Sequence, residues 1–276
     1  MPIERDFDAL ALGFFLPQED PVSSKYSLSL KANTAWEDLY TINLHCREGD
    51  FSKLTHVREI LLRSQDSLIW YAGVNILGCA GGWTEMTAAL SHLQKLQNEE
   101  WVRFHLSALI GLSCDIRAVP LLVKLYSIGT NPDEDRDQTL RELSYLLESD
   151  DGPIFYSRDD QPTPEILAER VDSIRSSVAD GLVGMKVFEA RTLDVVQLAK
   201  GMLAKLEAED AQSERFHRGL LIFEAATGVN CTGLFNEKGR DRRLDAVAVL
   251  EEFLESDQLN RFVPGQRYFF GHPIPD

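Results

Sequence analysis

Two stretches of the chain, LIWYAGVNILGCAGG at residues 68–82 and WVRFHLSALIGLSCD at residues 101–115, can be written one above the other without a gap. The offset is 33 residues, and it places Gly78 on Gly111 with apolar residues matched around them. Each copy has the apolar density of a buried helix. A segment that recurs at this period predicts stacked units, because such units bury their apolar faces only against their neighbours.

Each copy is followed by a second amphipathic stretch, TEMTAALSHLQKLQ at residues 84–97 and IRAVPLLVKLYSIG at residues 116–129. One period therefore holds two helices, which is the size of a helical-solenoid unit. The shared glycine is expected to let one helix turn tightly into the next. Helical periodicity also dominates the rest of the chain, and strand-length alternation of apolar and polar residues is hard to find, so an all-α fold is predicted.

The sequence ALIGLSCDIRAVPLLVKLY at residues 108–126 resembles the junction of a HEAT repeat. In such a junction a helix ends in a turn of small residues and Gly, an Asp follows, and the next helix opens with an Arg-Ala-Val-Pro-Leu-Leu pattern. Asp115 would cap that next helix, and Pro120 would lie within its first turn or two. The resemblance extends over residues 66–127. It implies a right-handed α-solenoid of HEAT-like helical hairpins in one continuous array.

We interpret residues 1–276 as a single helical-repeat domain with five parts. They are an N-terminal lead-in at 1–33, N-terminal repeats at 34–130, an acidic insertion at 131–163, C-terminal helical repeats at 164–256 and a capping tail at 257–276. The tail is aromatic, and we expect it to pack back as a terminal cap, which a solenoid needs at each end. The aromatic residues concerned are Phe262, Tyr268, Phe269 and Phe270.

The chain is strongly acidic. Its 276 residues include 44 Asp and Glu against 28 Lys and Arg, for a formal net charge of −16. Residues 131–172 carry 13 acidic residues against 4 arginines, which is more than half of that net charge. Because general nucleic-acid binding depends on basic residues that contact phosphates, this charge disfavours it and favours a basic protein partner.

The sequence shows no pattern of a secretory signal or a membrane helix, so we expect a soluble, cytoplasmic protein. The first residues, MPIERDFDALALGFFLP, do not have the basic start, long apolar stretch and cleavage site of a secretory signal. No apolar run approaches the roughly 18 residues that a membrane helix requires. The four cysteines, at 46, 79, 114 and 231, form no CxxC or CxxH pair and are interpreted as reduced, buried thiols.

No motif in the chain indicates catalysis or a bound metal. The six histidines form no HExxH, HxH or His/Cys cluster, and the acidic runs DEDRD and ESDD lack the ligand spacing of a calcium loop. Gly78, Gly81 and Gly82 follow a helix instead of a strand, which argues against a phosphate loop. Cys231 has no placed His partner. We therefore expect no catalytic residue, no metal and no cofactor, and a protein that is not an enzyme.

Two surfaces are candidates for binding a partner. Aromatic residues Trp70, Tyr71, Trp101 and Phe104 fall on the helices that would line the concave surface of a HEAT array, either as core or as contacts. The charged residues that flank them are expected to face solvent. The acidic segment is either solvated or a second contact surface. The candidate partner-binding residues are Asp66, Trp70, Glu99, Glu100, Trp101, Arg103, Asp133, Glu134, Asp135, Asp137, Asp150, Asp151, Asp159 and Asp160.

A compact, acidic chain with HEAT-like units is similar to the immunity proteins of bacterial polymorphic-toxin and contact-dependent systems, many of which are helical-repeat proteins. This resemblance implies a protein that binds and neutralises a cognate toxin domain, of nuclease or transferase type, in the cytoplasm of the producing cell. One alternative is a general helical-repeat scaffold or adaptor. Another is a HEAT-like lyase that attaches bilin chromophores, or a DNA glycosylase, although a glycosylase would need a basic groove that the net charge disfavours.

Overall fold

The computed structural model describes residues 35–96, 99–131, 134–149, 155, 161–208, 214–231 and 243–276. Within these residues the chain is predominantly helical, as predicted, and its strands are only two residues long. The α-helices are α2 (Ala35–Arg47), α3 (Leu54–Arg63), α4 (Ser67–Ala80), α5 (Trp83–Leu93), α6 (Glu100–Leu112), α7 (Val119–Ile128), α8 (Asp135–Leu147), α9 (Pro164–Asp180), α10 (Val195–Glu207), α11 (Glu214–Thr227) and α12 (Arg243–Glu255).

Short elements join these helices. The 3-10 helices are η2 (Phe51–Lys53), η3 (Gln94–Leu96), η4 (Ile116–Ala118) and η5 (Asp257–Arg261). The strands form two antiparallel hairpins, in which β1 (Val187–Phe188) pairs with β2 (Arg191–Thr192) and β3 (Tyr268–Phe269) pairs with β4 (His272–Pro273). No helix of the described residues has both the length and the apolar character needed to cross a bilayer.

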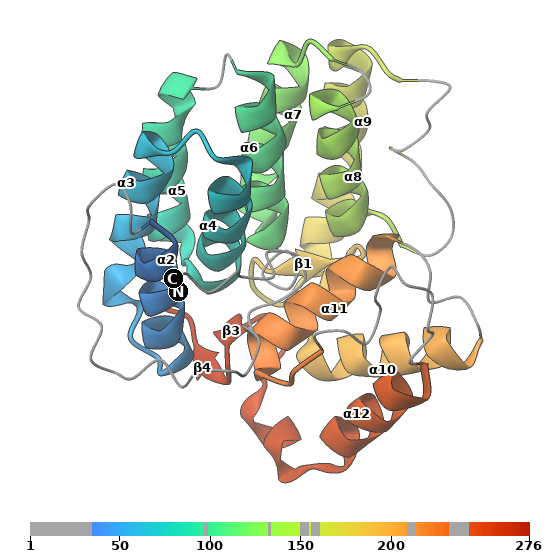
Figure 1. Ribbon diagram of the computed structural model, residues 1–276. Coiled ribbons are helices and arrows are strands. Elements are labelled where there is room, and N and C mark those ends of the chain that lie inside the picture. Colours follow the sequence, from blue (N-terminus) through green and yellow to red (C-terminus); the bar gives the residue numbers. More distant parts are fainter. Residues whose placement is uncertain are drawn as a thin grey trace.

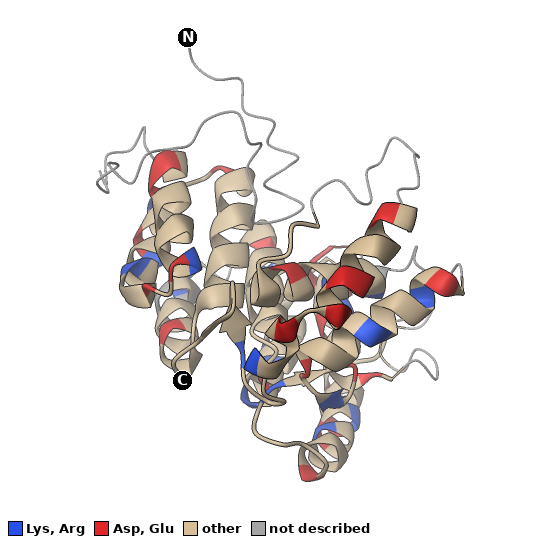
Figure 2. Ribbon diagram, turned by 90° about the horizontal axis from the view of Figure 1, so that it is seen from below, with Lys and Arg blue, Asp and Glu red and all other residues tan. Residues whose placement is uncertain are grey.

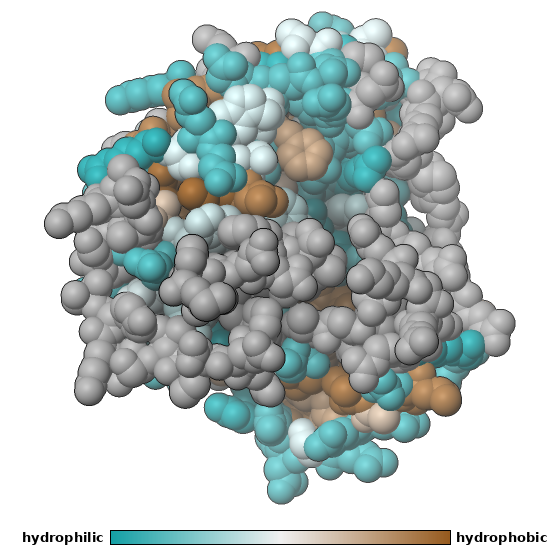
Figure 3. All heavy atoms as spheres, viewed as in Figure 1, coloured by the Kyte–Doolittle hydropathy of each residue, from teal (hydrophilic) through white to brown (hydrophobic). Residues whose placement is uncertain are grey.

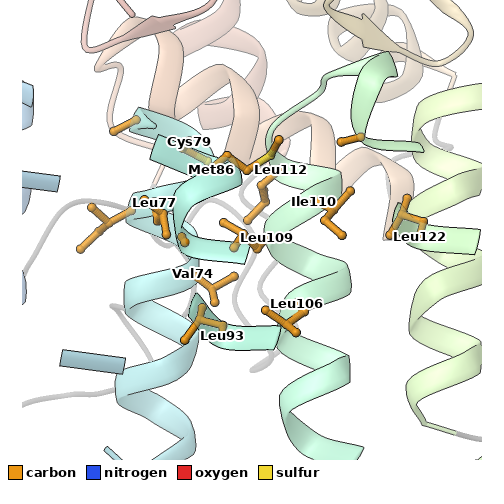
Figure 4. Close-up of a cluster of buried hydrophobic side chains, with 14 of the residues drawn as sticks. Val74, Leu77, Cys79, Met86, Leu93, Leu106, Leu109, Ile110, Leu112 and Leu122 are labelled. Atoms are coloured by element: carbon orange, nitrogen blue, oxygen red, sulfur yellow. The ribbon is translucent and has the colours of Figure 1, made fainter. Parts of the chain in front are cut away.

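Helices α4, α6 and α8 lie side by side, with their N-terminal ends at one edge, which is the upper edge in Figure 1. Helices α3, α5, α7 and α9 pack behind and between them, so the chain alternates between two layers as in a helical-repeat array. Val74 and Leu77 of α4 and Leu106 and Leu109 of α6 point into the shared interior (Figure 4). The repeat predicted from the sequence thus corresponds to neighbouring helices of one layer.

The repeated glycine has a different role from the one predicted. Gly78 and Gly111 are helical residues in the last turns of α4 and α6, and neither has the positive φ of a turn glycine. A Cβ on Gly78 would lie 2.7 Å from the Leu112 Cβ of α6, and one on Gly111 would lie 1.8 Å from the Glu142 carboxylate of α8. Each glycine therefore admits the next helix of the layer. One period further along, Ser144 of α8 accepts a hydrogen bond from Arg215 of α11, at 2.7 Å.

The junction between α6 and α7 begins with a capped turn, as expected from the sequence. The Asp115 side chain accepts from the Arg117 backbone N–H, at 2.9 Å, and so caps η4, which leads directly into α7. Pro120 occupies the first turn of α7, where a missing N–H costs no helix hydrogen bond. The predicted place of Pro120 is confirmed, whereas Asp115 caps the short 3-10 helix that precedes α7 and not α7 itself.

The acidic segment after residue 130 is partly a member of the array. Helix α8 packs on both α6 and α7, and its Asp135 and Asp137 are buried. The prediction that these two carboxylates are surface charges is wrong, because each faces a cation in the protein. Asp133, Asp150, Asp151, Asp159 and Asp160 lie outside the described residues, as do residues 1–34.

Helices α10, α11 and α12 pack around a second apolar core that includes Phe216, Phe223 and Phe253. Helix α11 runs obliquely across the layer, from the C-terminal part of α8 toward α4 (Figure 1). Although α9 packs on α7 as the next helix of the array, α10 to α12 form a lobe with its own core.

The C-terminal tail packs back, as predicted for its aromatic residues. Phe269 is fully buried in the first core, whereas Phe262 and Tyr268 belong to the second. Arg267 donates to the carbonyl oxygens of Gly81 (2.7 Å), Cys79 (2.8 Å) and Gly78, which are the open acceptors at the end of α4. The tail therefore joins the array to the C-terminal lobe, and it does not lie at an end of the array.

A pair of glycine variants tests the close approach of α6 and α8. We expect Gly111→Ala to lower the free energy of unfolding by about 2 kcal/mol or more, because its methyl group would overlap a buried carboxylate. Gly201→Ala in α10 is the matched control, since its Cβ would meet nothing within 4 Å, and it should stabilise by about 0.5–1 kcal/mol. Urea unfolding measures both values, and a neutral Gly111→Ala would contradict the packing.

Candidate partner-binding face

A polar seam joins α6 to α8. Along α6, Arg103, Ser107 and Gly111 follow one another at four-residue intervals, and on α8 they meet three polar residues at nearly the same spacing. The contacts are Arg103 Nε to Asp135, the Ser107 and Thr139 hydroxyls at 2.8 Å, and Gly111 against Glu142. Because residues four apart share a helix face, the seam fixes one register between the two helices.

The buried end of this seam is fully paired. Arg103 and Asp135 are 3% and 1% exposed, and Arg103 Nη2 also donates to Thr130 Oγ1 at 2.9 Å. Asp135 accepts from the backbone N–H of Asn131 at 3.1 Å. The expectation that Arg103 faces solvent is therefore wrong. Asp137 is likewise occupied, by Arg141 at 2.8 Å, so neither Asp135 nor Asp137 is available to a partner.

At its other end the seam anchors α11. Arg218 of α11 donates to Glu142, whose other oxygen has no hydrogen-bond partner among the described residues. Burial raises the pKa of Glu142 to about 7 although Arg218, Gln138 and Arg141 oppose the rise. The Arg218 guanidinium also lies 5.1 Å from the centre of the Tyr145 ring. Sequence reasoning missed these residues, although arginines in the apolar stretch RFHRGLLIFEAA were a signal.

A second arginine completes this anchor. Arg215 lies one helical turn before Arg218 and donates to Ser144 Oγ at 2.7 Å, to Glu148 Oε2 at 3.0 Å and to the Ser149 carbonyl at 3.2 Å. Glu148 is fully buried and also accepts from Ser144 Oγ at 2.5 Å. Helix α11 is therefore bound to α8 by two charge-assisted contacts three residues apart.

The aromatic candidates divide into core and surface. Trp70 is fully buried, its indole N–H donates to the Ser64 carbonyl at 3.0 Å, and its ring meets Trp101 edge-on with 5.1 Å between centres. Trp70 is therefore a core residue in this structure. Tyr71, Trp101 and Phe104 are half-buried. Leu68, one helical turn before Tyr71, is 43% exposed and was not among the candidates.

These side chains form one face. We call Leu68, Tyr71, Trp101 and Phe104 the α4–α6 face. In Figure 3 apolar and pale aromatic side chains form a patch on the upper part of the molecule, with hydrophilic side chains above it. Exposed apolar groups that lie together in this way mark interaction sites more often than scattered ones do.

An acidic edge borders the face. Asp66, Glu99 and Glu134 are exposed and occupy the residue immediately before α4, α6 and α8, so the common edge of three parallel helices carries three carboxylates. The positive ends of the helix dipoles stabilise negative charge there. Asp66 accepts from the Leu68 N–H at 2.8 Å, and the half-buried Glu100 accepts from the Asn131 side chain at 2.6 Å.

The distribution of charge elsewhere is mixed. Seen from below in Figure 2, acidic and basic positions are interspersed on the helices that face the viewer. In the interior, Asp115 accepts from Arg117 and from Lys186 Nζ, at 2.6 Å each, and Lys186 also reaches Asp276 at 2.8 Å. Although burial opposes it, these hydrogen bonds lower the pKa of Asp115. In this cluster Asp115, Lys186 and Asp276 are all paired, and the contacts connect the residue before η4 to the C-terminal tail.

The cysteines of the chain are in environments that suppress their reactivity. All four cysteines are buried, and burial raises the pKa of Cys46 and Cys79 to about 12 and that of Cys114 to about 11. Burial raises the pKa of Cys231 as well. Because the thiolate is the reactive form, these environments disfavour cysteine catalysis. Within the described part of the chain, no group of three or more His, Cys, Asp or Glu residues is arranged to hold a metal ion.

Comparisons with known proteins add no relative, since no protein-family model, curated protein or solved structure matches the chain.

His105 provides a test of how far the interior between α4 and α6 excludes water. Burial among Trp70, Trp101 and Phe104 lowers the pKa of His105 from 6.5 to about 4, and its Nδ1 has no partner within the described residues. The unfolded chain therefore takes up a proton as pH falls from 6.5 to 4 while the folded one does not, so stability falls by up to roughly 3 kcal/mol over that window. We expect His105→Phe to remove this part of the acid sensitivity. Urea unfolding of both proteins at pH 7 and pH 4 measures the difference, and an equal loss in both would contradict the prediction.

The seam makes a separate prediction about the acidic residues that are buried. Arg103→Leu leaves Asp135 buried without its cation and should lower the free energy of unfolding by about 3–5 kcal/mol. Adding Asp135→Asn should recover part of that loss, because the remaining side chain is neutral. Thermal and urea unfolding of the three proteins measure this coupling. Strictly additive losses would show that the two side chains do not interact.

Proposed function

We propose that the chain is a non-enzymatic, HEAT-like helical-repeat protein of the right-handed solenoid type that binds a basic protein partner through the α4–α6 face. The observation that carries the proposal is this half-exposed aromatic face, which is bordered by Asp66, Glu99 and Glu134. Large aromatic side chains surrounded by polar residues supply most of the binding energy at protein interfaces. Exposed carboxylates at the border accelerate encounter with a basic partner.

The kind of partner follows from the charge and from the resemblance to immunity proteins. A net charge of −16 suits a cytoplasmic protein that neutralises a basic toxin domain of nuclease or transferase type in the producing cell. Binding rather than catalysis is supported by the suppressed thiols and by the neutral His105. A scaffold or adaptor would use the same face but would not protect a cell. The acidic border disfavours a DNA glycosylase, whose substrate is itself an anion.

A matched pair of surface variants tests the face. Leu68 on α4 and Ile166 on α9 are 43% and 49% exposed, so replacing either by Ser should leave folding intact. We expect Leu68→Ser, and likewise Phe104→Ala, to weaken capture of the partner from the producing cell at least tenfold, while Ile166→Ser has no effect. The captured protein is then expressed as a toxin, and growth rescue by wild type, Leu68→Ser and Ile166→Ser is compared.

The two readouts separate the alternatives. Rescue by wild type and Ile166→Ser but not by Leu68→Ser supports an immunity protein that acts through the α4–α6 face. Capture without toxicity of the partner supports a scaffold. If both variants lose capture of the partner equally, or if neither loses it, the α4–α6 face is ruled out as the binding surface.

A further inference from the structure

The molecule contains its own example of a helix bound across the array. Helix α11 crosses the layer at α8 and also contacts α4, and two of its arginines enter the interface from one side of the helix. Arg218 combines a carboxylate partner, Glu142, with an aromatic ring, Tyr145. Although burial opposes its charge, Glu142, Tyr145 and Tyr71 together raise the pKa of Arg218. The layer is thus suited to hold a guanidinium between a carboxylate and an aromatic ring.

The α4–α6 face continues directly from this internal interface and offers the same combination of groups. Tyr71 lies on α4, which α11 contacts, and its side chain is half-exposed. Beyond Tyr71, the face presents the rings of Trp101 and Phe104, and the edge above them presents the carboxylates of Asp66 and Glu99. In the region covered by α11, the carboxylate of Glu142 and the ring of Tyr145 both contact Arg218. On the α4–α6 face the carboxylates are exposed and the aromatic rings are half-exposed.

From this continuity we infer that the segment of the partner that docks on the α4–α6 face is an amphipathic helix carrying arginines three or four residues apart, laid across α4 and α6 beside α11. The inference rests on the proposed function and specifies the chemistry of its partner. The guanidinium groups stack on Trp101 and Phe104 and pair with Asp66 and Glu99, and apolar residues of the helix cover Leu68.

A helix fits this face better than the other modes of recognition. Strand addition requires an open sheet edge, and the strands of the described residues are two residues long and already paired. Arginine fits better than lysine, because its planar group can stack on a ring while it donates two hydrogen bonds to a carboxylate. A lysine at the same position supplies only a point charge.

A direct experiment uses the full-length protein and three synthetic 18-residue peptides, each a fluorescein-labelled amphipathic helix with leucines on one side. They carry arginines at i, i+3 and i+7, lysines at the same positions, or the same arginines in scrambled order. Anisotropy at 0.15 M salt is expected to show the ordered arginine helix binding at least fivefold more tightly than the other two. Phe104→Ala and the double variant Asp66→Asn/Glu99→Gln should each weaken that binding about tenfold.

The matched control is Glu165→Gln/Glu169→Gln, which removes two exposed carboxylates from α9 and should leave the affinity unchanged. Equal affinity for the three peptides, or an equal effect of the α9 variant, overturns the inference, because binding would then reflect net charge alone. Its failure is distinguishable from failure of the proposed function. If Leu68→Ser abolishes partner capture but cross-links from the α4–α6 face reach a strand or loop of the partner, the function stands and the arginine helix does not.

Discussion

The Arg103–Asp135 ion pair and the two contacts that follow it along α6 and α8 determine how α8 lies against α6 and, through α8, where α11 is held. A buried ion pair adds little net stability, because desolvation offsets most of its attraction. Its effect here is specificity. An apolar seam would tolerate a shift of α8 by one turn, whereas such a shift would leave Arg103, Asp135 and Glu142 buried without partners.

Because the seam fixes α8, it also fixes the C-terminal lobe. Glu142 and Glu148 lie where Arg218 and Arg215 of α11 reach them. The tail then links α11 to α4. Its Phe270 N–H donates to the Ala225 carbonyl of α11 at 2.7 Å, and its Arg267 donates to carbonyl oxygens at the end of α4. Helix α11 consequently covers the part of the layer near the C-terminal ends of its helices, and the α4–α6 face lies beyond it, toward their N-terminal ends.

The sequence predicts the helices of the array well but the polar contacts between helices poorly, because the first depend on nearby residues and the second on distant ones. A helix and its cap depend on neighbours within a few residues, so the repeat, Asp115 and Pro120 could be interpreted locally. The partner of Asp135 is 32 residues away, and a run of carboxylates is typical of solvated loops until that partner is known. Gly111 was misjudged for the same reason, because the side chain for which it makes room belongs to the next helix of the layer.

The distinction between buried and exposed carboxylates also decides what the net charge of −16 can do. Asp115, Asp135, Glu142 and Glu148 each face a lysine or arginine inside the protein, so each pair contributes little to the field that an approaching molecule meets. Asp66 and Glu99 are exposed, and the dipoles of α4 and α6 reduce the cost of holding their charge at one edge. Among these carboxylates, the charge that acts at a distance therefore lies beside the aromatic face. Under the proposed function, a basic partner attracted to this edge would meet the apolar side chains beside it.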